Sequence, residues 1–276
     1  MEFNSIDPIG HEEGPSRLFR NHRLRRGIYI LPSMFTVANL LCGYHAILAI
    51  FEGKPEYFDK AACAIGFAIL FDSLDGRVAR LMGTDSEFGK QFDSLADVVS
   101  FGMAPAFLAY AWGIRALAAA NTSDSVHLTQ LGWLIGSFYL GCCAWRLARF
   151  IIQGMAPGGS RFFAGMPTPA AAGMIAATVH AFKNPIQDGH VALMWLALVV
   201  VLGLLMSSTV RYYSFKDFQW TRRMPSLAII LLVIVIASIV LFSQVTLMLI
   251  ASTYVIQGVT LFVVRSVRHR IASRPA

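Results

Sequence analysis

Charged side chains are scarce in this sequence. Asp, Glu, Lys and Arg make up 14% of its 276 residues, where a soluble domain carries about 25%. Hydrophobic residues reach 56%, and stretches such as LAIILLVIVIASIVLF offer no polar face to water. This composition argues against a soluble all-helical protein and predicts an all-α integral membrane protein.

Cysteine is also rare, which argues against a disulfide framework or a zinc motif. The four cysteines lie inside apolar runs, with no zinc-ligand spacing and no pair in loops: Cys42, Cys63, Cys142 and Cys143. We interpret them as small packing residues. His45 and His180 also fall in apolar runs, where packing or hydrogen bonding is a more ordinary role than metal binding.

Long apolar runs are abundant. About 20 apolar residues of helix cross a bilayer core, and eight runs approach this length, at approximately 33–51, 60–82, 91–116, 129–151, 167–183, 190–208, 225–241 and 244–264. The first six predict a transmembrane core and the last two an additional pair of helices. We therefore divide the chain into a basic N-terminal arm at 1–27, the core at 28–208, a loop with the two additional helices at 209–264, and a basic tail at 265–276.

Positive charge is concentrated on one side of the predicted membrane. Eight spans place both termini on the same side. Only Lys54, Lys60, Arg115 and Lys183 fall on the other side, which leaves 19 of the 23 Lys and Arg residues with the termini. Cytoplasmic loops hold the excess of such residues, so both termini are predicted to be cytoplasmic. The net charge of +7 would then face anionic headgroups rather than nucleic acid.

One apolar region nevertheless gathers carboxylates. Asp72 and Asp75 lie three residues apart in the second run, and Asp93 and Asp97 lie four apart in the third. An Asp at the centre of a membrane helix costs about 2.5 to 3.5 kcal/mol, and such residues usually mark functional sites. Helix capping, or pairing with nearby arginines, is the alternative, and the ordered spacing favours function.

The spacing also predicts that the four carboxylates share one site. Residues three or four apart lie on one helix face, and the short LMGTDSEF connection makes the two helices antiparallel neighbours. Mutual repulsion then calls for hard divalent cations, Mg²⁺ or Mn²⁺, and two such ions reached by substrate phosphates recur in phosphoryl chemistry. Gly76 and Ala79 continue the face of Asp72 and leave room for a bulky ligand.

These residues form a pattern that resembles a known family. The string Asp72-x2-Asp75-Gly76-x2-Ala79-Arg80-x8-Gly89-x3-Asp93-x3-Asp97 matches the signature of the CDP-alcohol phosphotransferases at every fixed position. The resemblance implies a membrane enzyme of about eight helices with a six-helix catalytic core, assembled as a homodimer. Such an enzyme moves a phosphatidyl or similar group from a CDP-linked donor to an alcohol and releases CMP.

The same resemblance implies roles for individual residues. Asp72, Asp75 and Asp93 would bind two Mg²⁺ or Mn²⁺ ions, and Asp97 would act as general base and as a further metal ligand. The CDP part of the donor would lie against a set of small and polar residues, which are Gly76, Ala79, Arg80, Thr36, Asn39 and Ser86. Thr36 and Asn39 could reach this site from the first run, or could instead make interhelical hydrogen bonds.

Two further stretches are similar to the phosphatidylserine synthase branch of that family. They are LPSMFTVANLLCGY, and RLARF with the later FAGMPTPAAAG; the chain departs from the branch pattern at Ser33 and Ile151, where Asn is expected. Arg146, Arg149 and Arg161 would hold the carboxylate of serine, since an Arg fork matches a carboxylate bidentately. The same arginines would also suit a phosphate, or would serve only the positive-inside bias.

The resemblance therefore implies transfer of the phosphatidyl group from CDP-diacylglycerol to L-serine at the cytoplasmic face of a bacterial inner membrane. Transfer to glycerol-phosphate, inositol-phosphate or choline is the alternative within the family. A divalent-cation transporter would also place carboxylates in membrane helices. It would need polar residues across the whole membrane, whereas these carboxylates are confined to the cytoplasmic portion of two runs.

Overall fold

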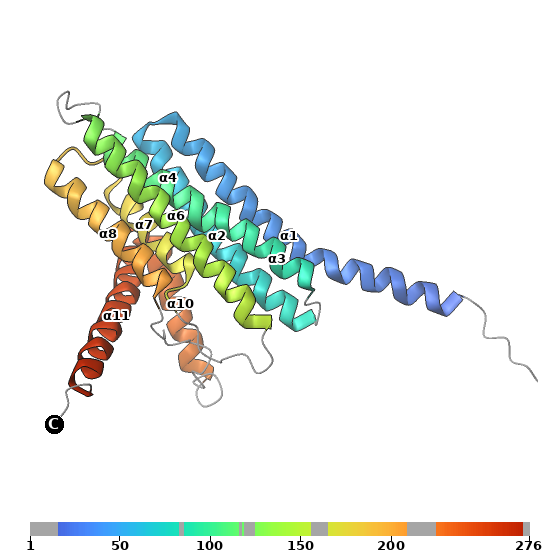
Figure 1. The fold of residues 1–276 in the computed structure, drawn as a ribbon. Helices are drawn as coiled ribbons and strands as arrows, with labels where there is room; N and C mark the ends of the chain where they lie inside the picture. The colour runs from blue at the N-terminus through green and yellow to red at the C-terminus, as the bar shows by residue number, and fades with distance from the viewer. Residues whose placement is uncertain are drawn as a thin grey trace, which may run out of the picture.

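The computed structural model describes residues 16–82, 86–115, 118, 125–155, 165–208 and 225–272, and every regular element in these ranges is helical. Two long helices come first, α1 (Ser16–Glu52) and α2 (Pro55–Met82). A continuous rod follows, made of α3 (Glu87–Asp97), the π-helical turn η1 (Val98–Met103), α4 (Ala104–Tyr110) and a second π-helical turn, η2 (Ala111–Arg115). The bundle is completed by α6 (Ser125–Met155), α7 (Thr168–Phe182) and α8 (Gly189–Ser207), from which α10 (Pro225–Leu241) and α11 (Ser243–Ala272) diverge (Figure 1).

Each of the eight apolar runs coincides with one of these helices or with the rod from α3 to η2. Within the described residues, four segments are long and apolar enough to cross a membrane by length and composition alone: Met34–Glu52, Glu87–Arg115, Val126–Ile152 and Gly189–Ser207. Of the others, α7 has only 15 residues and α10 only 17. The prediction of an all-helical membrane protein is confirmed.

Two helices extend beyond the boundaries that the sequence predicted. Helix α1 begins at Ser16, inside the segment expected to be a separate arm, and α11 runs to Ala272, inside the expected tail. The 37 residues of α1 span about 55 Å at 1.5 Å per residue, which exceeds the ~30 Å hydrocarbon core. Figure 1 shows the N-terminal part of α1 projecting from the bundle. Hydropathy locates the apolar part of a helix and does not report where the helix itself begins.

Small side chains allow the first two helices to pack closely. Ala46 on α1 and Ala61 and Ala68 on α2 are fully buried, and small residues let the backbones of membrane helices approach one another. Large apolar side chains such as Leu41 and Phe67 point outward and stay more than half exposed, as expected of surfaces that contact lipid. The burial pattern is therefore that of a bundle with a close-packed interior and an apolar exterior.

Helix α7 lies at the centre of the bundle. It packs against α2, α4, η1, α8 and α11, and Ala171, Ile175 and Val179 along its length have no exposed surface. It begins after Pro167 and ends at Lys183, whose φ of 57° stops the helix. The position of α7 brings its two ends to opposite ends of the bundle, so that one helix contributes to two separate polar clusters.

Candidate active site

Three of the predicted carboxylates converge between α2 and α3. One carboxylate oxygen from each of Asp72, Asp93 and Asp97 lies within 4.8 Å of the others. Asp97 is only 7% exposed, and Asp72 and Asp93 are partly buried. The spacing of these residues explains the convergence, because Asp93 and Asp97 share one face of α3 and that face is turned toward α2.

Asp75 lies beside this group and is held by α1. Its carboxylate accepts a hydrogen bond from the hydroxyl of Thr36, and it is 7% exposed. It is close enough to Asp72 and Asp93 for their charges to interact. All four aspartates therefore occupy one polar region, with Asp75 turned toward α1 and the other three turned toward one another.

Helix α1 also positions Asp97. The side-chain amide of Asn39 donates a hydrogen bond to Oδ1 of Asp97 at 3.1 Å, and Asn39 is fully buried. Ser100, on the π-helical turn that follows Asp97, donates its hydroxyl proton to the main-chain carbonyl of Asn39 at 2.9 Å. Gly43 permits this approach, because a Cβ there would lie only 2.7 Å from the Cα of Ser100.

The donor set fits a hard divalent cation. It consists of carboxylate oxygens, the ligands that Mg²⁺ and Mn²⁺ prefer. Oδ1 of Asp93 is buried and has no hydrogen-bond partner among the residues that the structure describes. A buried anionic oxygen without a partner is costly, and a cation held jointly by Asp72, Asp93 and Asp97 would satisfy it.

Arg146 is the basic residue that the described structure places at this cluster. It lies on α6, is 8% exposed and is close enough to Asp72 and Asp97 for their charges to interact. Its Nη1 donates to the hydroxyl of Thr168 at the start of α7, at 3.3 Å. Its Nε is buried without a partner among the described residues, so the guanidinium retains a donor for a further group.

The other two predicted acceptor arginines are placed differently. Arg149 donates to the main-chain carbonyls of Ser207 and Ser208 at 3.4 and 3.0 Å, where it satisfies carbonyls at the end of α8. Arg161 lies outside the described residues. The two neighbouring arginines on α6 thus have different surroundings, one in the site and one at a helix end.

The predicted donor-binding residues are also dispersed. Thr36 and Asn39 reach the aspartates, as described above. Gly76 is exposed on α2, and Ala79 and Arg80 continue that helix, with side chains outside the described part. The hydroxyl of Ser86 accepts a hydrogen bond from the main-chain N–H of Gly89 at 3.0 Å, which makes Ser86 the N-cap of α3.

Sequence reasoning missed two residues that hold the site together, Ser100 and Thr168. Both are fully or almost fully buried polar residues, and each makes a hydrogen bond across the bundle. Thr168 had a weak local signal, since it stands between Pro167 and Pro169 in a stretch already singled out. Ser100 had none, because its partner on α1 is 61 residues away.

The arrangement as a whole is an anionic cluster within an apolar bundle, with the buried guanidinium of Arg146 beside it. Such a site can bind divalent cations together with phosphate oxygens. It also places a buried carboxylate, Asp97, near a group that can hold an anionic substrate, Arg146.

Comparison with known proteins adds an independent finding. The family model for CDP-alcohol phosphatidyltransferases matches residues 29–203, which include all four aspartates and Arg146. A CDP-diacylglycerol--serine O-phosphatidyltransferase of Helicobacter pylori is 33% identical over 209 residues, which are 75% of this chain and 82% of that protein. A protein of the same name from Mycobacterium leprae is 37% identical over 67% of this chain and 58% of its own length. An archaetidylserine synthase of Methanothermobacter thermautotrophicus is 34% identical over 66% of this chain and 69% of its own length.

Proposed function

This chain belongs to the CDP-alcohol phosphatidyltransferase family, and we propose that it transfers the phosphatidyl group of CDP-diacylglycerol to L-serine, giving phosphatidylserine and CMP. The observation that carries the proposal is the convergence of the carboxylates of Asp72, Asp93 and Asp97, together with the buried Oδ1 of Asp93, which has no hydrogen-bond partner among the described residues. The choice of serine is supported by the names of the relatives in Helicobacter, Mycobacterium and Methanothermobacter, each of which contains serine.

Asp72, Asp75, Asp93 and Asp97 are the proposed metal ligands, for two Mg²⁺ or Mn²⁺ ions. When bound, these ions supply positive charge that neutralises the pyrophosphate of the donor and the departing CMP. The hydrogen bond from the Thr36 hydroxyl holds the Asp75 carboxylate in position. The CDP moiety would lie along Gly76, Ala79 and Arg80 of α2, with Ser86 at the start of α3.

Asp97 is the proposed general base. It would accept the hydroxyl proton of serine while that oxygen forms a bond to the lipid-bearing phosphorus and the bond from this phosphorus to CMP breaks. The hydrogen bond from Asn39 to Oδ1 of Asp97 fixes the carboxylate, and its burial excludes competing water. Arg146 would bind the serine carboxylate through its Nε, which has no partner among the described residues. Arg149 and Arg161 are the other two proposed acceptor-binding residues.

The proposal also includes location and assembly. The enzyme would lie in a bacterial inner membrane with both termini and the site at the cytoplasmic face, since the excess of Lys and Arg lies on that side. Serine would then reach the site from the cytoplasm, and the donor from the bilayer. Assembly as a homodimer is carried over from the family resemblance.

The test is an assay of the purified full-length protein in mixed micelles with CDP-diacylglycerol. Serine, glycerol-phosphate, inositol-phosphate and choline are supplied separately, and CMP release is measured. We expect CMP release with serine and with none of the other three alcohols. Excess chelator should abolish this release, and added Mg²⁺ or Mn²⁺ should restore it. Release with another alcohol and not with serine would contradict the assigned acceptor, and full activity in chelator would contradict the metal assignment.

Variants of single carboxylates localise the chemistry. Asp72→Asn and Asp93→Asn should each abolish CMP release while the protein remains folded. The matched control is Asp188→Asn, because Asp188 accepts a hydrogen bond from the N–H of His190 at the start of α8 and Asn caps a helix about as well as Asp. Equal losses in all three variants would show that the effect is not specific to the cluster.

A further inference from the structure

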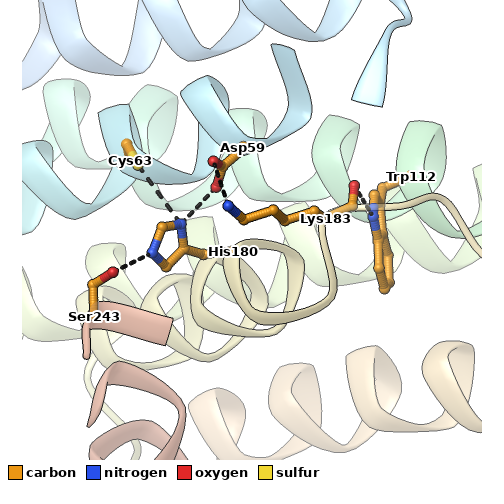
Figure 2. Close-up of polar contacts among 6 residues, drawn as sticks. All are labelled: Asp59, Cys63, Trp112, His180, Lys183 and Ser243. Atoms are coloured by element: carbon orange, nitrogen blue, oxygen red, sulfur yellow. Dashed lines mark hydrogen bonds and ion pairs between the residues drawn. The ribbon is translucent and has the colours of Figure 1, made fainter. Parts of the chain in front are cut away.

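A second cluster of chemically reactive side chains lies far from the aspartates of the active site. Asp59 and Cys63 stand one turn apart on α2, His180 lies near the end of α7, and Ser243 begins α11 (Figure 2). Asp59 precedes Asp72 by 13 residues on the same helix, which corresponds to about 20 Å. The cluster therefore takes no part in the reaction proposed above.

The three donor atoms of this cluster lie close together. Nδ1 of His180 lies 2.5 Å from Oδ1 of Asp59 and 3.8 Å from Sγ of Cys63, and one ligand atom from each residue lies within 4.8 Å of the others. Thiolate, imidazole and carboxylate are the three ligand types that Zn²⁺ takes in proteins. This mixture differs from the oxygen-only set at the active site and selects a softer metal.

The distance between Sγ of Cys63 and Nδ1 of His180 is close to that in a tetrahedral zinc site. Bonds of about 2.0 to 2.3 Å separate neighbouring ligand atoms by roughly 3.5 Å, near the observed spacing of Cys63 and His180. The shorter spacing of Asp59 and His180 is that of a hydrogen bond. A metal that replaced the shared proton would move the carboxylate back by about 1 Å, which rotation of the Asp side chain can provide.

The second nitrogen of the ring already has the partner that a metal-bound histidine needs. Nε2 of His180 lies 2.9 Å from the hydroxyl of Ser243, and metal-ligating histidines almost always donate their other N–H to an oxygen that fixes the ring. Three protein ligands would leave the fourth position for water.

Charge balance also favours a divalent ion. The charges of Zn²⁺, the Asp59 carboxylate and the Cys63 thiolate sum to zero, which limits the cost of placing them in an apolar bundle. The ammonium of Lys183 lies 4.0 Å from Oδ2 of Asp59, and the Lys183 side chain is 51% exposed, so the ammonium can turn to solvent when the metal binds. The main-chain carbonyl of Lys183 accepts a hydrogen bond from Trp112 at 3.3 Å, and this contact keeps the end of α7 in place.

We propose that Asp59, Cys63 and His180 form a zinc site that joins α2 to α7, with Ser243 of α11 as the outer partner of the histidine. The hydrogen-bonded series Asp59, His180 and Ser243 also has the order of a hydrolytic triad. Cys63 beside Nδ1 is a donor that a triad does not use, and it favours the metal.

The experiment uses the full-length protein, reduced and metal-free in detergent micelles, with Mg²⁺ in excess to saturate the oxygen-only site. Co²⁺ replaces Zn²⁺ as the spectroscopic probe. We expect one equivalent of Co²⁺ to produce a thiolate-to-cobalt charge-transfer band and tetrahedral d–d bands, both removed by Zn²⁺.

Three variants test the ligands. Cys63→Ser should abolish the charge-transfer band, and Cys42→Ser, which removes a thiol of α1, should retain it. Ser243→Ala should weaken Co²⁺ binding roughly 10- to 100-fold with the band preserved.

A second measurement needs no variant. Cys63 is exposed and should react with a maleimide in the metal-free protein, and one equivalent of Zn²⁺ should protect it. A charge-transfer band that is absent, or that persists in Cys63→Ser, would overturn the proposal. The proposal would also be overturned if a fluorophosphonate labels Ser243 and Zn²⁺ fails to protect Cys63 from the maleimide. That combination would favour a hydrolytic triad.

Discussion

The close approach of α1 to the π-helical turn η1 leads to a quantitative prediction for Gly43→Ala. The added methyl carbon would lie 2.7 Å from the Cα of Ser100 and 3.0 Å from its Cβ, whereas carbon atoms pack at about 3.5 to 4.0 Å. The main chain cannot rotate away as a flexible side chain can. The two helical segments must therefore separate by about 1 Å.

This separation acts directly on the proposed base. It would lengthen the hydrogen bond from Ser100 to the carbonyl of Asn39 and, through Asn39, shift the amide that holds Asp97. A displacement of 1 Å at a catalytic group lowers the rate on the order of 10²-fold. Overpacking costs about 1 to 3 kcal/mol, partly offset by the gain of about 1 kcal/mol when Ala replaces Gly in a helix. Activity should thus fall far more than stability.

The assay compares CMP release and thermal unfolding in detergent for Gly43→Ala and Gly66→Ala. Gly66 lies in the interior of α2, where an added Cβ would meet nothing within 4 Å, so this control should keep the wild-type rate. If Gly43→Ala also keeps the wild-type rate, the contact between α1 and η1 does not position Asp97. If both variants lose activity, the cause is a general intolerance of these helices to alanine.

Three further predictions concern single charged residues, two in the site and one at the end of α8. Asp97→Asn should lower kcat by roughly 10²- to 10⁴-fold with donor affinity retained; a parallel loss of donor binding would make Asp97 chiefly a metal ligand. Arg146→Lys should mainly raise the KM for serine, because Lys keeps the charge without the planar fork, and an unchanged KM would contradict that role. Arg149→Lys should lower the Tm, since its hydrogen bonds to the carbonyls of Ser207 and Ser208 are worth about 1.5 to 3 kcal/mol; a raised KM for serine would instead place Arg149 at the acceptor.

The helices and the grouping of the aspartates were accessible to sequence reasoning because both follow local rules. Long apolar runs mark the helices, and spacings of three and four residues place Asp72 and Asp75, or Asp93 and Asp97, on one face. The short connection between α2 and α3 then limits how the two faces can meet. These inferences need only residues that are close in sequence.

The remaining features depend on residues far apart in the chain. Arg146 and Arg149 look equivalent in sequence, and only the position of the end of α8, 58 and 59 residues further on, separates their roles. His180 and Cys63 are 117 residues apart in sequence, so the spacing of cysteines and histidines could not predict that cluster. The π-helical turns also lack a local signature, because each packs against helices that are distant in sequence: η1 against α1 and α6, and η2 against α6 and α8.

The burial of α7 has a consequence for how the protein is made. A helix of 15 residues is shorter than the ~20 that cross a bilayer unaided, and its Ala-rich surface gives it little affinity for lipid. We therefore expect that the sequence of α7 alone is not sufficient for its insertion into the membrane. Entry of α7 should await the helices that enclose it, among them α11, which is synthesised more than 60 residues later. A chain truncated before α11 should expose α7 to early proteolysis, even though every proposed catalytic residue has already been synthesised.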